Sequence, residues 1–252
     1  MHTLCKIIVP GVIVALVNTL YAVEQPDVTK IINYVDTLYR SSSSQSTVAM
    51  TISTPHWERT LVMDIWTEGM KKTFIRIKSP KKEQGVSTLR IGNEMWNYLP
   101  KANKVIKIPP SMMMSSWMGS DFTNDDLVKE STMIDDYTYR LVRPPEARNE
   151  WWYAELIPKP DRPIVWSKII LAVRKEDYIP VEEIYYDDND KPVRRLEFTD
   201  ITTFDNRKIP SCLVMIPLTK EGHKTVIQYR DIQFNVALDQ DVFTLRHLRS
   251  GP

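Results

Sequence analysis

The acidic residues Asp121, Asp125 and Asp126 form the densest group of side chains that could perform chemistry. Three carboxylates over six residues could bind calcium or act as an acid and a base in catalysis. A calcium loop needs more oxygen ligands at fixed spacing and usually a glycine in mid-turn, and this stretch lacks that pattern. The simpler interpretation is that Asp121 or Asn124 caps a short helix, whose first turn favours acidic side chains through the helix dipole. Catalysis by these acids is the less favoured alternative.

The histidines and the cysteine of the mature chain are too scattered to predict a catalytic or metal site. His56, His223 and His247 lie at a turn, at a hairpin and near the C-terminus, and no cluster has the spacing of zinc ligands. The sequence contains neither a glycine-rich phosphate-binding loop nor a G-x-S-x-G nucleophile motif. Cys212 lies in an apolar run, where a buried structural thiol is expected. We therefore expect no enzymatic activity, no metal and no cofactor.

The N-terminal residues have the order of charge, apolar core and small residue that is typical of a secretory signal peptide. Lys6 precedes an apolar run over residues 7–20, and Ala22 offers a cleavage site. An uncleaved anchor is the alternative, but the run is short and is interrupted at Pro10. The sequence therefore predicts a signal peptide over residues 1–22 and export of the remainder.

The composition predicts one globular domain with balanced charge. The chain has 252 residues, with 33 Lys and Arg against 32 Asp and Glu, and 42% of its residues are hydrophobic. Balanced charge argues against a global nucleic-acid binder, and the hydrophobic fraction is sufficient for a core. We expect residues 23–252 to form a single monomeric domain without a nucleic-acid partner.

The hydrophobic periodicity predicts one helix followed by many short strands. Residues 27–40 place apolar side chains at helical spacing, with Asp27 in the N-cap position. From Thr47 onward, about ten to twelve short runs rich in β-branched and aromatic residues alternate with turn-like stretches. Short strands joined by tight turns predict an antiparallel sheet, and a sheet of this width curls or closes. The fold class is therefore mainly β, with a curved sheet whose concave face needs a cover.

The run over residues 89–99 illustrates how faces are assigned from alternation. If the alternation is continuous, Leu89 and Met95 share one face of the sheet. Trp96 and Tyr98 then share the opposite face.

The segment over residues 111–122 is unusual because it is rich in methionine and weak in β character. Methionine adapts to irregular apolar shapes and specifies a core poorly. A core plug and an adaptable ligand contact are therefore both open interpretations. The residues that we predict to contact an apolar ligand are Trp66, Trp96, Tyr98, Met112, Met113, Met114, Trp117, Met118 and Phe122.

A series of short motifs runs through the same region. The motifs are W-x-x-G at residues 66–69, R-I-x-x-P at 76–80, G-x-x-x-L at 85–89, W-x-Y-x-P at 96–100 and W-M-G-S-D-F at 117–122. With these motifs the chain resembles the LolA-like outer-membrane lipoprotein-sorting proteins, over most of the mature chain.

The resemblance implies an incomplete antiparallel barrel, with an N-terminal helix and a short helical lid covering an apolar concave face. It also implies a periplasmic transport chaperone that binds lipid or lipoprotein acyl chains without catalysis. Burial of a lipid chain is favourable by about 0.8 kcal/mol per methylene group, so such a carrier needs a water-free cavity.

A periplasmic sensor or accessory module of an envelope or membrane transport complex is the alternative function. Residues 58–107 carry eleven Lys and Arg against five Asp and Glu. This excess is consistent either with solvated faces that attract each other or with a basic rim that faces anionic headgroups or an acidic partner.

Overall fold

The structure, a computed structural model, describes residues 25–39, 41–128, 133–160, 162 and 164–250. The predicted signal peptide, residues 1–22, lies outside the described residues. The strands are β1 (Ser43–Ser53), β2 (Glu58–Glu68), β3 (Lys72–Ser79), β4 (Ser87–Ile91), β5 (Glu94–Leu99), β6 (Lys104–Lys107), β7 (Tyr137–Val142), β8 (Trp151–Pro158), β9 (Lys168–Arg174), β10 (Pro180–Tyr186), β11 (Pro192–Phe204), β12 (Arg207–Pro217) and β13 (Lys224–Phe234). The helices are α1 (Val28–Thr37), α2 (Asn124–Val128), α3 (Met133–Asp136) and α4 (Leu245–Arg249), with 3-10 turns η1 (Pro100–Ala102), η2 (Pro110–Met112) and η3 (Gln240–Phe243).

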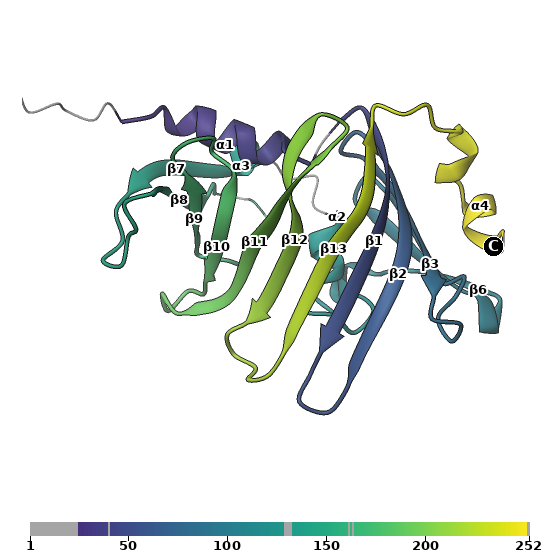
Figure 1. Cartoon of the computed structure of the whole chain (residues 1–252). Helices are drawn as coiled ribbons and strands as arrows, with labels where there is room; N and C mark the ends of the chain where they lie inside the picture. Colours follow the sequence, from purple (N-terminus) through teal and green to yellow (C-terminus); the bar gives the residue numbers. More distant parts are fainter. Residues whose placement is uncertain (1–24, 40, 129–132, 161, 163, 251–252) are drawn as a thin grey trace, which may run out of the picture.

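The described strands form one antiparallel sheet of thirteen strands in the order β6-β5-β4-β3-β2-β1-β13-β12-β11-β10-β9-β8-β7. The sheet is strongly curved, but β6 and β7 remain as its two separate edges, so it does not close (Figure 1). The prediction of a mainly β fold with a curved, incomplete barrel is confirmed.

Residues 89–99, which continuous alternation predicts to be one strand, belong to the hairpin of β4 and β5. This division into two strands helps to explain why the sheet has thirteen strands and not the ten to twelve that the sequence predicts. β4 and β5 are joined by Gly92 and Asn93, and Gly92 has a φ of 56°, which glycine adopts without steric cost. Leu89 pairs directly with Trp96 across the turn, and residues directly opposite each other share a face. Met95 therefore lies on the other face. The predicted sharing of a face by Leu89 and Met95 is wrong because a two-residue turn interrupts the alternation.

Two wings of the sheet meet at β12 and β13. These strands pair only where Cys212–Met215 oppose Thr225–Gln228, whereas β1 pairs with β13 along most of its length. We call β6 to β1 together with β13 the first wing, and β12 to β7 the second wing. Cys212 is buried, as predicted.

The N-terminal helix α1 begins where predicted. Asp27 is its N-cap, and its side chain accepts a hydrogen bond from the Thr29 backbone N–H at 2.9 Å. The buried side chains of Ile31, Ile32 and Val35 form one face, which packs on the second wing together with residues of β8 to β12.

Apolar clusters lie on both faces of the sheet. The face that carries α1 and α2 is the concave face, and its clusters continue from the first wing to the second because Ile227 of β13 opposes Leu213 of β12. On the convex face of the first wing, Phe74 and Leu89 are covered by Phe243 and Leu248 of the C-terminal segment. Figure 1 shows α2 inside the curve of the sheet and α4 outside it. Among the described residues, no helix combines the length and apolar character that crossing a bilayer requires.

Candidate functional site

A segment without long regular structure covers the concave face of the first wing. We call residues 109–128 the cover segment; it contains η2, a compact loop and α2. Trp117 is its central side chain, is only 4% exposed and packs among Leu61, Met63 and Met95. Its indole N–H donates to the Thr88 hydroxyl at 3.2 Å, so the one polar atom of the ring is satisfied.

The motif W-M-G-S-D-F forms the compact loop that turns Trp117 inward. The Trp117 backbone N–H donates to the Phe122 carbonyl at 2.8 Å, and the Ser120 N–H donates to the Trp117 carbonyl at 2.9 Å. Met118 and Gly119 both have left-handed backbones, with φ values of 51° and 75°. Such a conformation costs a non-glycine residue about 1–2 kcal/mol, so the surrounding contacts must hold Met118 in place.

Thr123, not Asp121 or Asn124, caps α2. The Thr123 hydroxyl accepts the Asp126 N–H at 3.1 Å, while the Asp126 carboxylate accepts the Thr123 N–H at 2.9 Å. This reciprocal pair is a capping box. Asp121 instead accepts a hydrogen bond from the Thr225 hydroxyl of β13 at 2.7 Å, and Asn124 donates to a backbone carbonyl of the cover segment at 3.0 Å. The helix at this position is confirmed, but the predicted capping residues are wrong because both side chains have partners outside the cap.

A buried charge cluster joins α2 to the second wing. Both terminal nitrogens of Arg194 donate to the two carboxylate oxygens of Asp126, each at 2.9 Å. The guanidinium group lies 4.3 Å from the ring centre of Trp166 and 4.2 Å from that of Tyr185. Glu183 is buried beside them and accepts the Tyr185 hydroxyl. We call Asp126, Glu183, Tyr185 and Arg194 the buried charge cluster.

The protonation states of this cluster follow from burial and charge. Burial alone raises the pKa of Asp126, but the hydrogen bonds and the charge of Arg194, together with Thr123, outweigh it and hold the pKa below its ordinary value. Burial raises the pKa of Glu183, although Tyr185 and Arg194 partly oppose this. The cluster therefore combines an ionised Asp126–Arg194 pair with a carboxyl group that resists ionisation.

The predicted ligand residues fall into three groups. Trp66, Trp96 and Tyr98 lie on the convex face with the C-terminal segment, in the cluster around Phe74 and Leu89. Met112 and Met114 are 47% and 45% exposed at the surface of the cover segment. The four on the concave side are Met113, Trp117, Met118 and Phe122. The structure does not bring the nine residues together, and only the last group faces the interior of the curved sheet.

Two of the three acidic residues singled out in the sequence are engaged by side chains of the sheet. Asp126 is engaged by Arg194 of β11, and Asp121 is engaged by Thr225 of β13. Among the residues that the structure describes, no group of three or more His, Cys, Asp or Glu side chains could hold a metal ion. Asp121 and Asp126 therefore attach the cover segment to two different strands.

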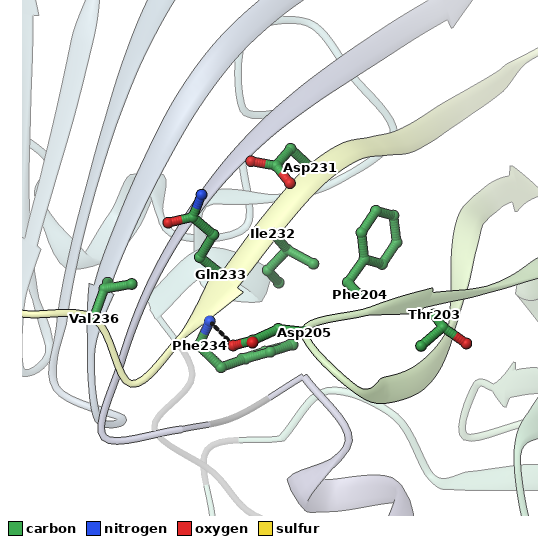
Figure 2. A pocket seen from close by; sticks show the side chains of 8 residues that line it. All are labelled: Thr203, Phe204, Asp205, Asp231, Ile232, Gln233, Phe234 and Val236. Carbon is green, nitrogen blue, oxygen red and sulfur yellow. Dashed lines mark hydrogen bonds between the residues drawn. The ribbon is translucent and has the colours of Figure 1, made fainter.

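A pocket of about 560 Å³ lies where the two wings separate beyond their short pairing (Figure 2). Its apolar wall is formed by Phe204, Ile232 and Phe234, and Asp205 and Asp231 add carboxylates. Asp205 accepts the Phe234 backbone N–H at 3.1 Å, so a side chain here replaces a missing ladder hydrogen bond. Because carboxylates line the pocket, it is a poor site for an acyl chain.

A second pocket, of about 590 Å³, lies on the convex face of the second wing. It is bounded by the loop that follows β7 and by Trp151, Tyr153 and Tyr186 of the sheet. Glu182 lines it, and burial raises the pKa of this carboxyl while Arg195 lowers it. This pocket is separate from the cover segment because its strand residues alternate with those that face α1.

Comparison with models of protein families assigns the chain to one family. A family model whose description reads "Uncharacterized protein" matches residues 69–250, which is well over half of the sequence. The chain belongs to this family. A search of curated proteins finds no match.

Solved structures with the same architecture come from several bacteria. A DUF1329 family protein from Desulfovibrio piger has a TM-score of 0.77 and 23% identity, covering 87% of this chain and 96% of that one. A putative outer membrane lipoprotein-sorting protein domain from Vibrio parahaemolyticus has a TM-score of 0.74 and 19% identity, covering 88% and 97%. A LolA superfamily protein from Nitrosomonas europaea has a TM-score of 0.71 and 21% identity, covering 87% and 98%. This family member therefore has a LolA-like fold.

The sequence reasoning missed the buried charge cluster. Arg194, Leu196 and Phe198 alternate along β11 and so share the concave face, which places a charged residue in an apolar row. That alternation was the available signal. Glu183 and Tyr185 of β10 follow the same rule.

Proposed function

We propose that this protein is a non-catalytic carrier that binds lipid or lipoprotein acyl chains between the concave face and the cover segment. We further propose that it works in the periplasm and delivers its cargo toward the outer membrane. The observation that carries the proposal is the apolar concave face of the first wing, covered by a methionine-rich segment that is not part of the sheet and adjoining the apolar cluster of the second wing, in which the buried charge cluster is the polar exception. The LolA-like fold and the predicted signal peptide support it.

The contacts under the cover segment are of a kind that an acyl chain can replace. Met113, Trp117, Met118 and Leu127 contribute apolar surface to the cluster of the first wing. If a hydrocarbon chain lies between these side chains and the sheet, the concave face stays out of water, the side chains of the cover pack on the guest, and each buried methylene group contributes about 0.8 kcal/mol. Methionine side chains can repack around a guest more readily than branched ones. The cover segment must move for the guest to enter, because Trp117 fills the space beneath it.

A few polar contacts attach the cover segment to the sheet. They are the Arg59 side chain on the Met118 carbonyl, the Trp117 indole on the Thr88 hydroxyl, the Asp121 contact with Thr225, and the ion pair of Asp126 with Arg194. A cover held mainly by apolar packing and such point contacts can separate without breaking a strand pair.

The test is to purify the exported protein, identify bound lipid by mass spectrometry and measure displacement of a fluorescent fatty acid. Replacing Trp117 and Met118 together by alanine should weaken fatty-acid binding more than it lowers the melting temperature. The matched control replaces Trp66 and Trp96 by alanine, since these aromatics lie on the convex face. The control should lower the melting temperature and leave binding intact.

Absence of both bound lipid and displacement would count against the carrier. If crosslinking in cells instead captured a stoichiometric protein partner that persists after delipidation, the chain would be an interaction module of an envelope complex. Equal effects of the two double variants on binding would show that Trp117 is an ordinary core residue.

A further inference from the structure

Four turns lie together where strands of the first wing and β12 end, on the same side of the sheet; we refer to this row of strand ends as an edge of the wing. They connect β1 to β2, β3 to β4, β5 to β6 and β12 to β13, and in an antiparallel sheet every second turn falls at the same edge. The tips of the β1–β2 and β12–β13 hairpins stand at the lower end of the sheet in Figure 1. They touch, because a Cβ added at Gly222 would lie 2.9 Å from Pro55 Cγ. Arg59 forms an ion pair with Glu83 at 3.3 Å and so joins the β1–β2 and β3–β4 turns.

This edge is rich in lysine. We call residues 54–59, 80–86, 100–104 and 218–224 the basic edge. Its acids are Glu58, Glu83 and Glu221, and Glu83 is held by Arg59. Its lysines are all exposed, and the structure shows no ion pair for them among the residues it describes; they are Lys81, Lys82, Lys101, Lys104, Lys220 and Lys224.

Exposed apolar side chains accompany these lysines. Trp57, at the tip of the β1–β2 hairpin, is 45% exposed, and Leu218 at the β12–β13 turn is 37% exposed. Arg59 of the basic edge donates to the Met118 carbonyl, which places the loop of the cover segment beside this edge. A tryptophan on a protruding turn among lysines matches the interfacial zone of a bilayer, where an aromatic ring sits at headgroup level and cations meet lipid phosphates.

We propose that the basic edge docks on the surface of a membrane that contains anionic lipids. The cations favour a lipid surface over a folded acidic partner for two reasons. The basic edge has seven cations, of which six are lysines and one is Arg59. Lysines act as point charges, whereas matched recognition of carboxylates favours the planar fork of arginine. The cations are also spread over four separate turns, which suits a fluid array of headgroups.

The distribution of charge elsewhere orients the docked protein. The turn between β10 and β11 lies at the same edge but in the second wing, and it carries Asp187, Asp188 and Asp190 against Lys191 and against Lys168 of β9, which pairs with Asp190. The pocket at the opposite end of the sheet carries Asp205 and Asp231. An anionic surface therefore attracts the basic edge more strongly than either of these regions, so the first wing faces the surface. This orientation brings the loop of the cover segment toward the bilayer.

The docking proposal goes beyond cargo binding and can be tested without cargo. The purified protein is sedimented with phosphatidylcholine vesicles, with or without phosphatidylglycerol. Each lysine near an anionic surface raises binding about fivefold. Replacing Lys81 and Lys82 by glutamate should therefore lower binding to the anionic vesicles at least about 20-fold. Trp57→Ala should lower it a few fold, and high salt should release the protein.

The matched control replaces Lys30 and Lys71 by glutamate. It makes the same charge change with one residue on α1 and one at the opposite edge, and both side chains are exposed. It should keep nearly all of the binding. No sedimentation with anionic vesicles, or equal losses in the two double variants, would overturn the proposal, and so would binding to soluble polyglutamate but not to vesicles. Fatty-acid displacement in solution should be unchanged in every variant, so failure of docking and failure of cargo binding are distinguishable.

Discussion

Arg194 shows how a charged side chain can occupy an apolar face. It lies in line with Leu196 and Phe198, is 7% exposed, and its guanidinium group contacts the rings of both Trp166 and Tyr185, which meet edge to face. Its planar guanidinium group combines ring contacts with a bidentate bond to a carboxylate. A lysine ammonium is strongly hydrated and could not reproduce both contacts. The residue type is therefore dictated by geometry as much as by charge.

Glu183 makes the free energy of unfolding depend on pH. Because burial raises its folded-state pKa above the ordinary value of 4.5, the unfolded chain ionises first as pH rises. Below pH 4.5 the ionisation of Glu183 does not change the free energy of unfolding. As pH rises from there toward the folded-state pKa of Glu183, the free energy of unfolding falls progressively. Glu183→Gln has no such loss, so its stability relative to the parent should increase with pH over this window. Urea unfolding from acidic to neutral pH measures the difference.

Glu197→Gln is the matched control for this measurement, since Glu197 is a partly exposed carboxylate that pairs with Arg195 at 3.3 Å. The effect of Asp126, whose pKa is lowered, is present in both the parent and the variant and cancels in the comparison. Parallel stability curves for the parent and Glu183→Gln would show that Glu183 is not a source of pH dependence.

At the scale of elements, α2 is too short to be stable alone. A helix of five residues gains little from its own hydrogen bonds, so its position depends on its cap and its contacts. Asp126 supplies both, because one carboxylate closes the capping box and binds Arg194. The attachment of the cover segment to the second wing therefore depends on this residue.

Asp126→Asn should lower the free energy of unfolding by about 3–5 kcal/mol, because it keeps the side-chain shape and leaves the Arg194 charge buried without a partner. Chemical denaturation measures this loss. Asp121→Asn is the control: its carboxylate accepts the Thr225 hydroxyl in a partly exposed place, so a loss of about 1 kcal/mol is expected. Similar losses in the two variants would mean that the ion pair carries no special share of the stability.

Local signals in the sequence predicted much of the fold. Alternation, turn composition and the Asp27 cap predicted the strands and α1 because these depend on residues close in sequence. The two faces of β4 and β5 were misassigned because one turn at Gly92 inverts the pattern. The cluster around Arg194 was not predicted because its members come from α2, β10 and β11, and only folding brings them together.

The candidate site was predicted only in part, because the composition of a segment does not show which face of the sheet its side chains occupy. Composition identified the methionine-rich segment, and the structure places it as a cover on the concave face. Composition does not reveal faces, so Trp66 and Trp96 were grouped with Trp117 although the sheet separates them. Their positions follow from the strand register, in which Trp66 pairs with Phe74 beneath the C-terminal segment.

At the scale of the whole molecule, the proposed carrier function requires the sheet to act as a fixed frame and the cover segment to move. The frame is a continuous ladder of antiparallel pairs, whereas the cover attaches through apolar packing and a few side-chain bonds. Asp121 and Thr225 are one such attachment, with their side-chain oxygens 2.7 Å apart. The Asp121 backbone N–H also donates to the Thr225 hydroxyl at 2.9 Å, so the cover backbone lies close to β13 at this point, as a disulfide between cover and frame requires.

A variant with cysteines at positions 121 and 225 tests whether opening is required. The background carries Cys212→Ala, which removes the buried native thiol. The oxidised protein should lose fatty-acid uptake because the cover can no longer separate from β13, and reduction should restore it. Each single-cysteine variant should bind equally well under both conditions. If the disulfide forms completely and uptake persists, cargo reaches the concave face by a route that leaves this end of the cover closed.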